Sequence, residues 1–121
     1  MRKTKRNILS AVLTLALLFS VMPLSVYADP AGSFTIEDAG GGALDSTDYD
    51  YTAPVLEIKG AGDYIVTGST TTDRILISGN ANVTLNNVDI DVSGTSDALS
   101  GAAIRVTAAD ATIILQGTNT L

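Results

Sequence analysis

The sequence contains no cysteine and no histidine. Without cysteine, no disulfide can hold the fold, and a lipid-modified N-terminal cysteine is excluded. The usual components of nucleophilic enzymes and metal-dependent hydrolases are missing, because the chain also lacks a Gly-x-Ser-x-Gly motif. Stability must therefore come from backbone hydrogen bonds between strands and from stacked apolar residues.

Basic residues are scarce beyond the N-terminus. Four of the seven lysines and arginines precede residue 29, whereas all 13 acidic residues follow residue 28. The remainder carries three basic residues against 13 acidic ones, a net charge of −10. This charge argues against nucleic-acid binding, which needs a basic surface. It fits a soluble extracellular protein with divalent cations as partners.

The first 28 residues have the pattern of a secretory signal peptide. A basic start is followed by an apolar run over Ile8–Met22, by Pro23 and by a small-residue exit at Ala28. The alternative is a membrane anchor, but the run falls short of the roughly 18 or more apolar residues that a spanning helix needs. We therefore expect residues 1–28 to be removed, with no membrane insertion afterwards, and the protein to be secreted or extracellular.

A short pattern occurs three times in the rest of the chain. The copies start at Leu56, Ile75 and Ile104 and read LEIKGAGDYIV, ILISGNANVTL and IRVTAADATII, which places them 19 and 29 residues apart. Repetition at such a period indicates a solenoid. Each copy contains two short strands separated by a polar corner, and no segment has the length or periodicity of a stable helix.

Stacking of the copies predicts apolar columns along the molecule. Gapless alignment gives four inward columns and one outward column, Glu57-Leu76-Arg105. The inward columns are Leu56-Ile75-Ile104, Ile58-Ile77-Val106, Tyr64-Val83-Thr112 and Val66-Leu85-Ile114. The fold class is therefore all-β, and we expect residues 54–121 to form about three incomplete coils of a parallel β-helix.

Residues 29–53 precede the coils and are expected to form an N-terminal cap of strands and loop. They contain the strand candidate SFTIE, a glycine-rich loop and the strand candidate YDYT. Tyr49 and Tyr51 lie on one side of the last strand, where they would cover the open end of the first coil. The same two rings are also candidates for a carbohydrate-stacking surface.

The third copy is ten residues further from the second than the second is from the first. We place this surplus in an extruded loop, Ser93–Ala102, which is either a binding face or a tolerated excursion. Directly before and within it, Asp89, Asp91, Ser93 and Asp97 have the spacing of the first part of a Ca²⁺ loop. The bidentate Glu of an EF-hand is missing. The alternatives are a different Ca²⁺ geometry and a solvated acidic strand end.

The asparagines at the corners, Asn80, Asn82, Asn86 and Asn87, suit hydrogen bonding to turn backbone. The chain stops at Leu121 within a coil and without a polar cap. Unpaired backbone groups at such an edge favour self-association. We therefore expect a truncated solenoid, either the N-terminal part of a longer protein or a chain that needs a partner.

Three segments carry a resemblance to a known family: VTGSTTTDRI from Val66, VTLNNVDID from Val83 and LQGTNTL from Leu115. They resemble the repeats of secreted bacterial right-handed parallel β-helix proteins that are carbohydrate-binding domains of pectin-lyase-like architecture. The resemblance implies a right-handed coil, a cell-surface or secreted bacterial location, and binding of acidic or neutral polysaccharide or cell-surface glycan, in some members with Ca²⁺. It covers roughly residues 34–121.

Three functions remain open at this stage. The first is a non-catalytic exported module that binds carbohydrate or mediates adhesion. The second is a fragment of a Ca²⁺-assisted polysaccharide lyase, in which Arg74 and Arg105 would act beside Asp89, Asp91 and Asp97. Both arginines start strands, however, where outward, salt-linked side chains are expected. The third is a purely structural stalk repeat.

Overall fold

The computed structural model describes residues 28–94 and 101–121, and within them the protein is all-β. The predicted signal peptide lies outside the described residues except for Ala28, the first residue of β1. The described part contains no helix long and apolar enough to span a bilayer. The strands are β1 (Ala28–Ala31), β2 (Phe34–Asp38), β3 (Tyr49–Thr52), β4 (Val55–Ile58), β5 (Asp63–Thr70), β6 (Arg74–Ile77), β7 (Asn82–Ile90), β8 (Ile104–Val106) and β9 (Thr112–Gln116).

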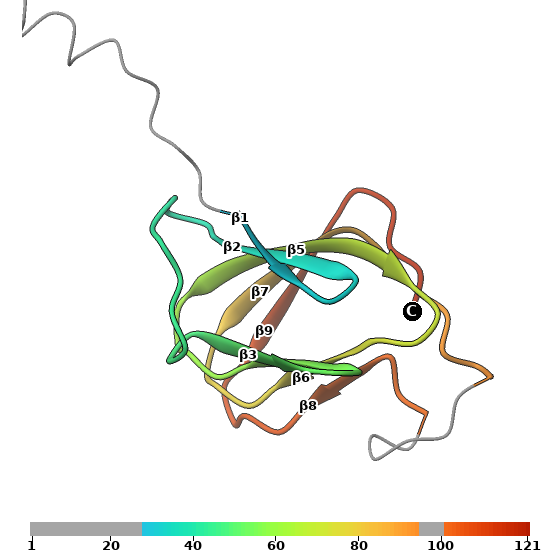
Figure 1. Cartoon of the computed structure of the whole chain (residues 1–121). Coiled ribbons are helices and arrows are strands. Elements are labelled where there is room, and N and C mark those ends of the chain that lie inside the picture. The colour runs from blue at the N-terminus through green and yellow to red at the C-terminus, as the bar shows by residue number, and fades with distance from the viewer. Residues whose placement is uncertain (1–27, 95–100) are drawn as a thin grey trace, which may run out of the picture.

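The strands form two mixed sheets that face each other. One sheet has the order β1-β2-β5-β7-β9 and the other has the order β3-β4-β6-β8. From β4 onward the chain alternates between the sheets, and from β6 onward each new strand pairs in parallel with the preceding strand of its own sheet. Figure 1 shows β5, β7 and β9 one behind another on one side, opposite β6 and β8. The two layers enclose one core.

The first half of each repeat has the predicted register. Ile75 pairs with both Leu56 and Ile104, and Ile77 pairs with Ile58 and Val106. The outward column Glu57-Leu76-Arg105 is also present. Period-2 alternation within strands of three or four residues is sufficient to fix these columns.

The second half of the third repeat corrects the gapless alignment by one residue. Val83 pairs with Tyr64 as predicted but with Ile113 instead of Thr112, and Leu85 pairs with Leu115 instead of Ile114. The corner before β9 is one residue longer than the earlier corners, so β9 is shifted. Because side chains alternate between faces, this shift brings Ile113 and Leu115 to the core side.

The core consists of the inward columns together with residues from the N-terminal strands. Its buried apolar residues are Ala31, Phe34, Ile36, Leu56, Ile58, Tyr64, Val66, Ile75, Ile77, Ala81, Val83, Leu85, Val88, Ile90 and Val92. The third coil is much less covered, since Val106, Ile113, Ile114, Leu115 and Leu121 are exposed.

The ten surplus residues are divided between two places. Val66 pairs with Leu85 but Gly68 pairs with Val88, so a bulge in β7 contains one of the surplus residues. The other surplus residues lie in the segment between β7 and β8. Asn87 lies in this bulge with a φ of 54°. Its Oδ1 accepts a hydrogen bond from the Thr118 N–H at 3.0 Å, as predicted for a corner asparagine.

The N-terminal strands close the first end of the stack. In the five-stranded sheet β2 pairs antiparallel with β5, and in the four-stranded sheet β3 pairs antiparallel with β4. The loop between β2 and β3 lies at the same end of the stack. There the backbone carbonyl of Asp48 accepts hydrogen bonds from the N–H groups of Lys59 and Gly60, both at 2.9 Å. The predicted strands SFTIE and YDYT therefore correspond to β2 and β3.

Candidate functional site

A pocket lies between the two edge strands of the capped end, β1 and β3. Its volume is about 340 Å³, and its lining is Pro30, Leu44, Asp45, Ser46, Tyr49, Asp50 and Tyr51. β1 and β3 are each the first strand of their sheet, so their outer edges have no neighbouring strand among the described residues. Pro30 has no backbone N–H, which disfavours the addition of a further strand at the β1 edge. The pocket thus combines two aromatic side chains with polar edge groups.

Tyr51 is held in place by a buried carboxylate. Its hydroxyl donates to Asp73 Oδ2 at 3.0 Å, and the same oxygen accepts the Ser33 N–H at 2.8 Å. Ser33 follows Gly32 in the turn between β1 and β2, where the φ of Gly32 is 65°. A Cβ atom on Gly32 would overlap the Tyr51 ring. Glycine is therefore needed there for both conformation and space.

The phenols of the pocket remain protonated over a wide pH range. Burial raises the pKa of Tyr49, and the neighbouring Asp29 carboxylate raises it further. Burial also raises the pKa of Tyr51, with an additional contribution from its hydrogen bond to Asp73. Both side chains consequently present a neutral ring at neutral pH.

Asp45 contributes a carboxylate held by the local turn. Its Oδ1 accepts hydrogen bonds from Thr47 Oγ1 at 2.6 Å and from the Thr47 N–H at 2.7 Å. These bonds lower the pKa of Asp45, the side-chain bond having the larger effect. The carboxylate is therefore ionised at neutral pH and lies on an exposed residue.

Sequence reasoning identified Tyr49 and Tyr51 but missed the rest of this pocket. Pro30 and Leu44 come from segments without a site-like pattern, and only the fold brings them beside β3. A signal for Asp45 was present in the sequence, because Asp-Ser-Thr-Asp is typical of a turn in which the first carboxylate accepts backbone N–H groups.

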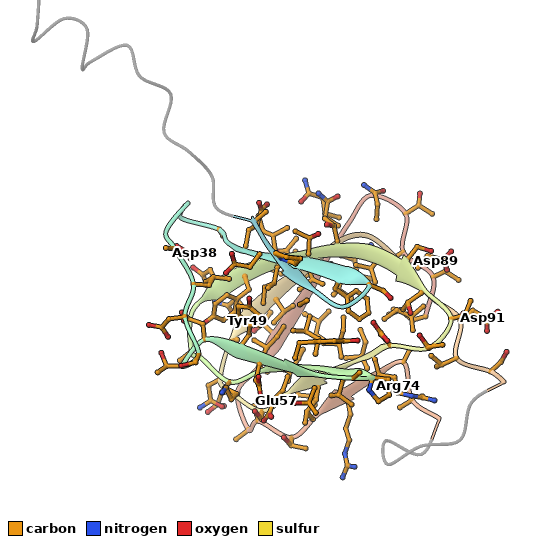
Figure 2. All side chains as sticks on the ribbon, in the orientation of Figure 1. Asp38, Tyr49, Glu57, Arg74, Asp89 and Asp91 are labelled. Atoms are coloured by element: carbon orange, nitrogen blue, oxygen red, sulfur yellow. The ribbon has the colours of Figure 1, made fainter. Side chains whose placement is uncertain are left out.

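The predicted Ca²⁺ segment lies at the opposite end of the strands, as Figure 2 shows for Asp89 and Asp91 relative to Tyr49. Ile90 and Val92 are buried, whereas Asp89 and Asp91 are exposed, so successive side chains alternate between the core and the outer face. A second pocket of about 570 Å³ is lined by Asp89, Ile90, Asp91, Val92, Ser93, Gly101, Ala103, Thr120 and Leu121.

The acidic segment has a local hydrogen-bond pattern of its own. Asp91 Oδ1 accepts from Ser93 Oγ at 2.8 Å and from the Ser93 N–H at 3.2 Å, and these bonds lower the pKa of Asp91. Asp97, the fourth predicted ligand, lies outside the described residues. Within residues 28–94 and 101–121, no three acidic side chains are grouped closely enough to hold a metal ion. The described oxygen-bearing residues are thus Asp89 in β7 and Asp91 and Ser93 directly after it.

The structure corrects the expectation that Arg74 points outward. Arg74 is 0% exposed, and its Nη1 donates to the Ala102 carbonyl at 2.9 Å. Ala102, shortly before β8, thus lies against a side chain that would otherwise meet solvent. Arg105 is exposed as expected, but it lies on β8 in the other sheet from Asp89. A buried arginine cannot contact a polymeric substrate directly.

Comparison with known proteins gave no match: no protein family, curated protein or solved structure is significantly similar to the chain. The case for a function therefore depends on the residues of the two pockets. The tyrosine pocket is the stronger candidate for a glycan site because two aromatic side chains line it, whereas no aromatic residue lines the second pocket.

Proposed function

We propose that the protein is an exported, non-catalytic module that binds polysaccharide or cell-surface glycan through the tyrosine pocket. The pocket between β1 and β3 carries this proposal, since its two tyrosines lie beside carboxylates and free strand edges. Aromatic faces pack against the C–H faces of sugar rings, while carboxylates and backbone edge groups hydrogen-bond to sugar hydroxyls. The sequence pattern of residues 1–28 supports export to the cell surface or medium.

The proposed fold behind this site is the start of a right-handed parallel β-helix. The parallel series β4-β6-β8 and β5-β7-β9, linked by a chain that alternates between the sheets, supports this assignment. Right-handed crossovers are strongly preferred between parallel strands of one sheet. In this fold, β1–β3 and the loop over the first corner form the N-terminal cap.

Replacement of Tyr49 by alanine is expected to weaken glycan binding about tenfold, equivalent to roughly 1.4 kcal/mol, because it removes one aromatic face. Tyr49→Phe keeps that face and is the matched control, with affinity close to wild type. Calorimetric titration with soluble neutral oligosaccharides measures both, and circular dichroism checks that the variants are folded. A folded Tyr49→Ala protein with wild-type affinity would place the binding site elsewhere.

Two alternative functions, a polysaccharide lyase and a structural stalk, predict different experimental results. Sustained release of unsaturated product from polygalacturonate with Ca²⁺ would overturn the non-catalytic proposal in favour of a lyase. A well-folded protein that binds no glycan in an array would favour a structural stalk.

We also propose that Ca²⁺ binds at Asp89, Asp91 and Ser93, with Asp97 as a further ligand. The adjacent pocket and the shared exposure of the first two carboxylates support this. Saturating Ca²⁺ at about 100 times its Kd is expected to stabilise the fold by about 2.7 kcal/mol relative to EDTA. Thermal melts measure the shift.

The matched control for this experiment removes two carboxylates at a distance from the segment. The double variant Asp89→Ala/Asp91→Ala should lose the Ca²⁺-dependent shift, whereas Asp63→Ala/Asp110→Ala should retain it. An equal Ca²⁺-dependent shift of the melting temperature in both double variants would show that the ion binds elsewhere. No such shift in the wild type would show that the protein does not bind Ca²⁺.

We further propose that the open C-terminal coil associates with a second copy. Ile113 and Leu115 occupy the columns that are fully buried at Val83 and Leu85, yet they are 39% and 65% exposed. The other end is already covered by β2 and β3, so two copies that associate through this coil would meet tail to tail. Such a contact uses the same surface on both subunits and closes as a dimer.

The double variant Ile113→Asp/Leu115→Asp is expected to be monomeric at concentrations where the wild type is dimeric, because paired carboxylates cannot be buried at the contact. Analytical ultracentrifugation over a concentration series measures this. Ala43→Asp, an exposed position in the loop at the covered end, is the control and should dimerise normally. Concentration-independent monomers of the wild type would contradict the proposal.

A further inference from the structure

The charge of the tyrosine pocket restricts the class of glycan that it can bind. Three acidic residues are involved: Asp45 and Asp50 line the pocket, and Asp29 lies beside Tyr49. No lysine or arginine is among the lining residues, and only three basic residues exist from residue 29 onward. A uronate or sulfated sugar would therefore bring a negative charge towards uncompensated carboxylates.

The aromatic side chains strengthen the same preference. A tyrosine face carries negative electrostatic potential and attracts ammonium groups, and combinations of aromatic faces with carboxylates are typical of sites for organic cations. Tyr49 and Tyr51 stay protonated well into the alkaline range because their pKa values are raised, so their rings keep this character. Asp45 is fixed by Thr47 in an ionised state.

We infer that the pocket selects a protonated amino sugar, as found in a glucosamine polymer whose amines are free. This inference rests on the proposed glycan-binding function of the same pocket and names its ligand class. The sugar ring packs on the tyrosine faces, the ammonium group lies towards Asp45, and neighbouring hydroxyls reach the edge groups of β3. N-acetylation removes the charge while it leaves the ring unchanged.

Three soluble oligosaccharides of equal length test the inference by calorimetric titration: glucosamine oligomers, N-acetylglucosamine oligomers and oligogalacturonate. The glucosamine oligomer is expected to bind severalfold more tightly than the N-acetylated one, because exposed ion pairs contribute modestly in water. Oligogalacturonate should bind most weakly. Raised salt should reduce the difference between the first two oligomers, since the difference is electrostatic.

Asp45→Asn should reduce the preference for the free amine, because it lowers the affinity for the glucosamine oligomer more than the affinity for the N-acetylated one. Asp110→Asn removes the same charge from an exposed corner outside the pocket and should retain the preference. Equal binding of both glucosamine-based oligomers by the wild type would overturn the inference but leave the glycan-binding function intact, as would tightest binding of oligogalacturonate. Absence of binding to all three would refute the proposed function itself.

Discussion

Replacement of Gly79 by alanine is expected to destabilise the fold by about 3 kcal/mol or more. Gly79 lies at the second corner, directly on the first, and a Cβ atom there would overlap the carbonyl oxygens of Lys59 and Gly60. Both obstacles are backbone atoms, so no side-chain rotation can relieve the overlap. The Gly79 N–H also donates to the Ile58 carbonyl at 3.1 Å, and this bond would be disturbed when the corners separate.

Gly94→Ala is the matched control, because the space around Gly94 is open and its φ is not positive. Its stability should stay within about 0.5 kcal/mol of wild type, the usual range for a surface substitution. Urea unfolding followed by circular dichroism gives both values. If the two variants unfolded at the same urea concentration, the corners would not be stacked as closely as the structure places them.

The sequence was sufficient to predict the stacking of the strands in the first half of each repeat, but not the register of the last strand. The stacking of Leu56, Ile75 and Ile104 was predictable because alternation in short strands fixes which residues face inward. The shift of β9 was not predictable from a gapless alignment, since one additional residue in a polar corner changes neither composition nor pattern. Only the backbone pairing of Val83 with Ile113 reveals it.

At the candidate sites, too, the sequence predicts residues that are neighbours on one strand but not residues that the fold brings together. Tyr49 and Tyr51 could be identified as a pair because both lie on one strand. Their pocket depends on Pro30 and Leu44, which are brought there by the pairing of β1 with β2 and by the loop that covers the first coil. Arg74 was misjudged for the same reason, because alternation alone cannot show that Ala102 returns to cover it.

Replacement of Asp73 by alanine is expected to destabilise the protein by about 2–4 kcal/mol at neutral pH. This carboxylate is only 5% exposed and accepts hydrogen bonds from the Ser33 N–H, the Tyr51 hydroxyl and Thr72 Oγ1. It therefore connects the β1–β2 turn and strand β3 to the corner before β6. The alanine variant leaves the Ser33 N–H and the Tyr51 hydroxyl without this acceptor.

The pH dependence of this loss distinguishes a charged acceptor from simple packing. Burial raises the pKa of Asp73, but the hydrogen bonds from Ser33, Tyr51 and Thr72 outweigh it, so the pKa is lowered in the folded protein. A lowered pKa means that the contribution is fully present above the unfolded value of about 3.9 and is lost as pH falls towards the folded value. The stability difference between wild type and Asp73→Ala should therefore shrink below about pH 4.

Two further measurements connect Asp73 to the tyrosine pocket. Spectroscopic titration should show a lower pKa for Tyr51 in Asp73→Ala, because the hydrogen bond and the nearby negative charge both raise it in the wild type. Asp63→Ala is the control, since Asp63 is exposed and its carboxylate accepts a hydrogen bond from the side chain of Asn82, at 2.7 Å from Nδ2. An equal loss of stability in both variants, or a loss in Asp73→Ala that is independent of pH, would show that Asp73 does not anchor the cap through its charge. Asp73→Ala should also weaken glycan binding, because Tyr51 would lose the hydrogen bond to Asp73 that fixes its ring beside Tyr49.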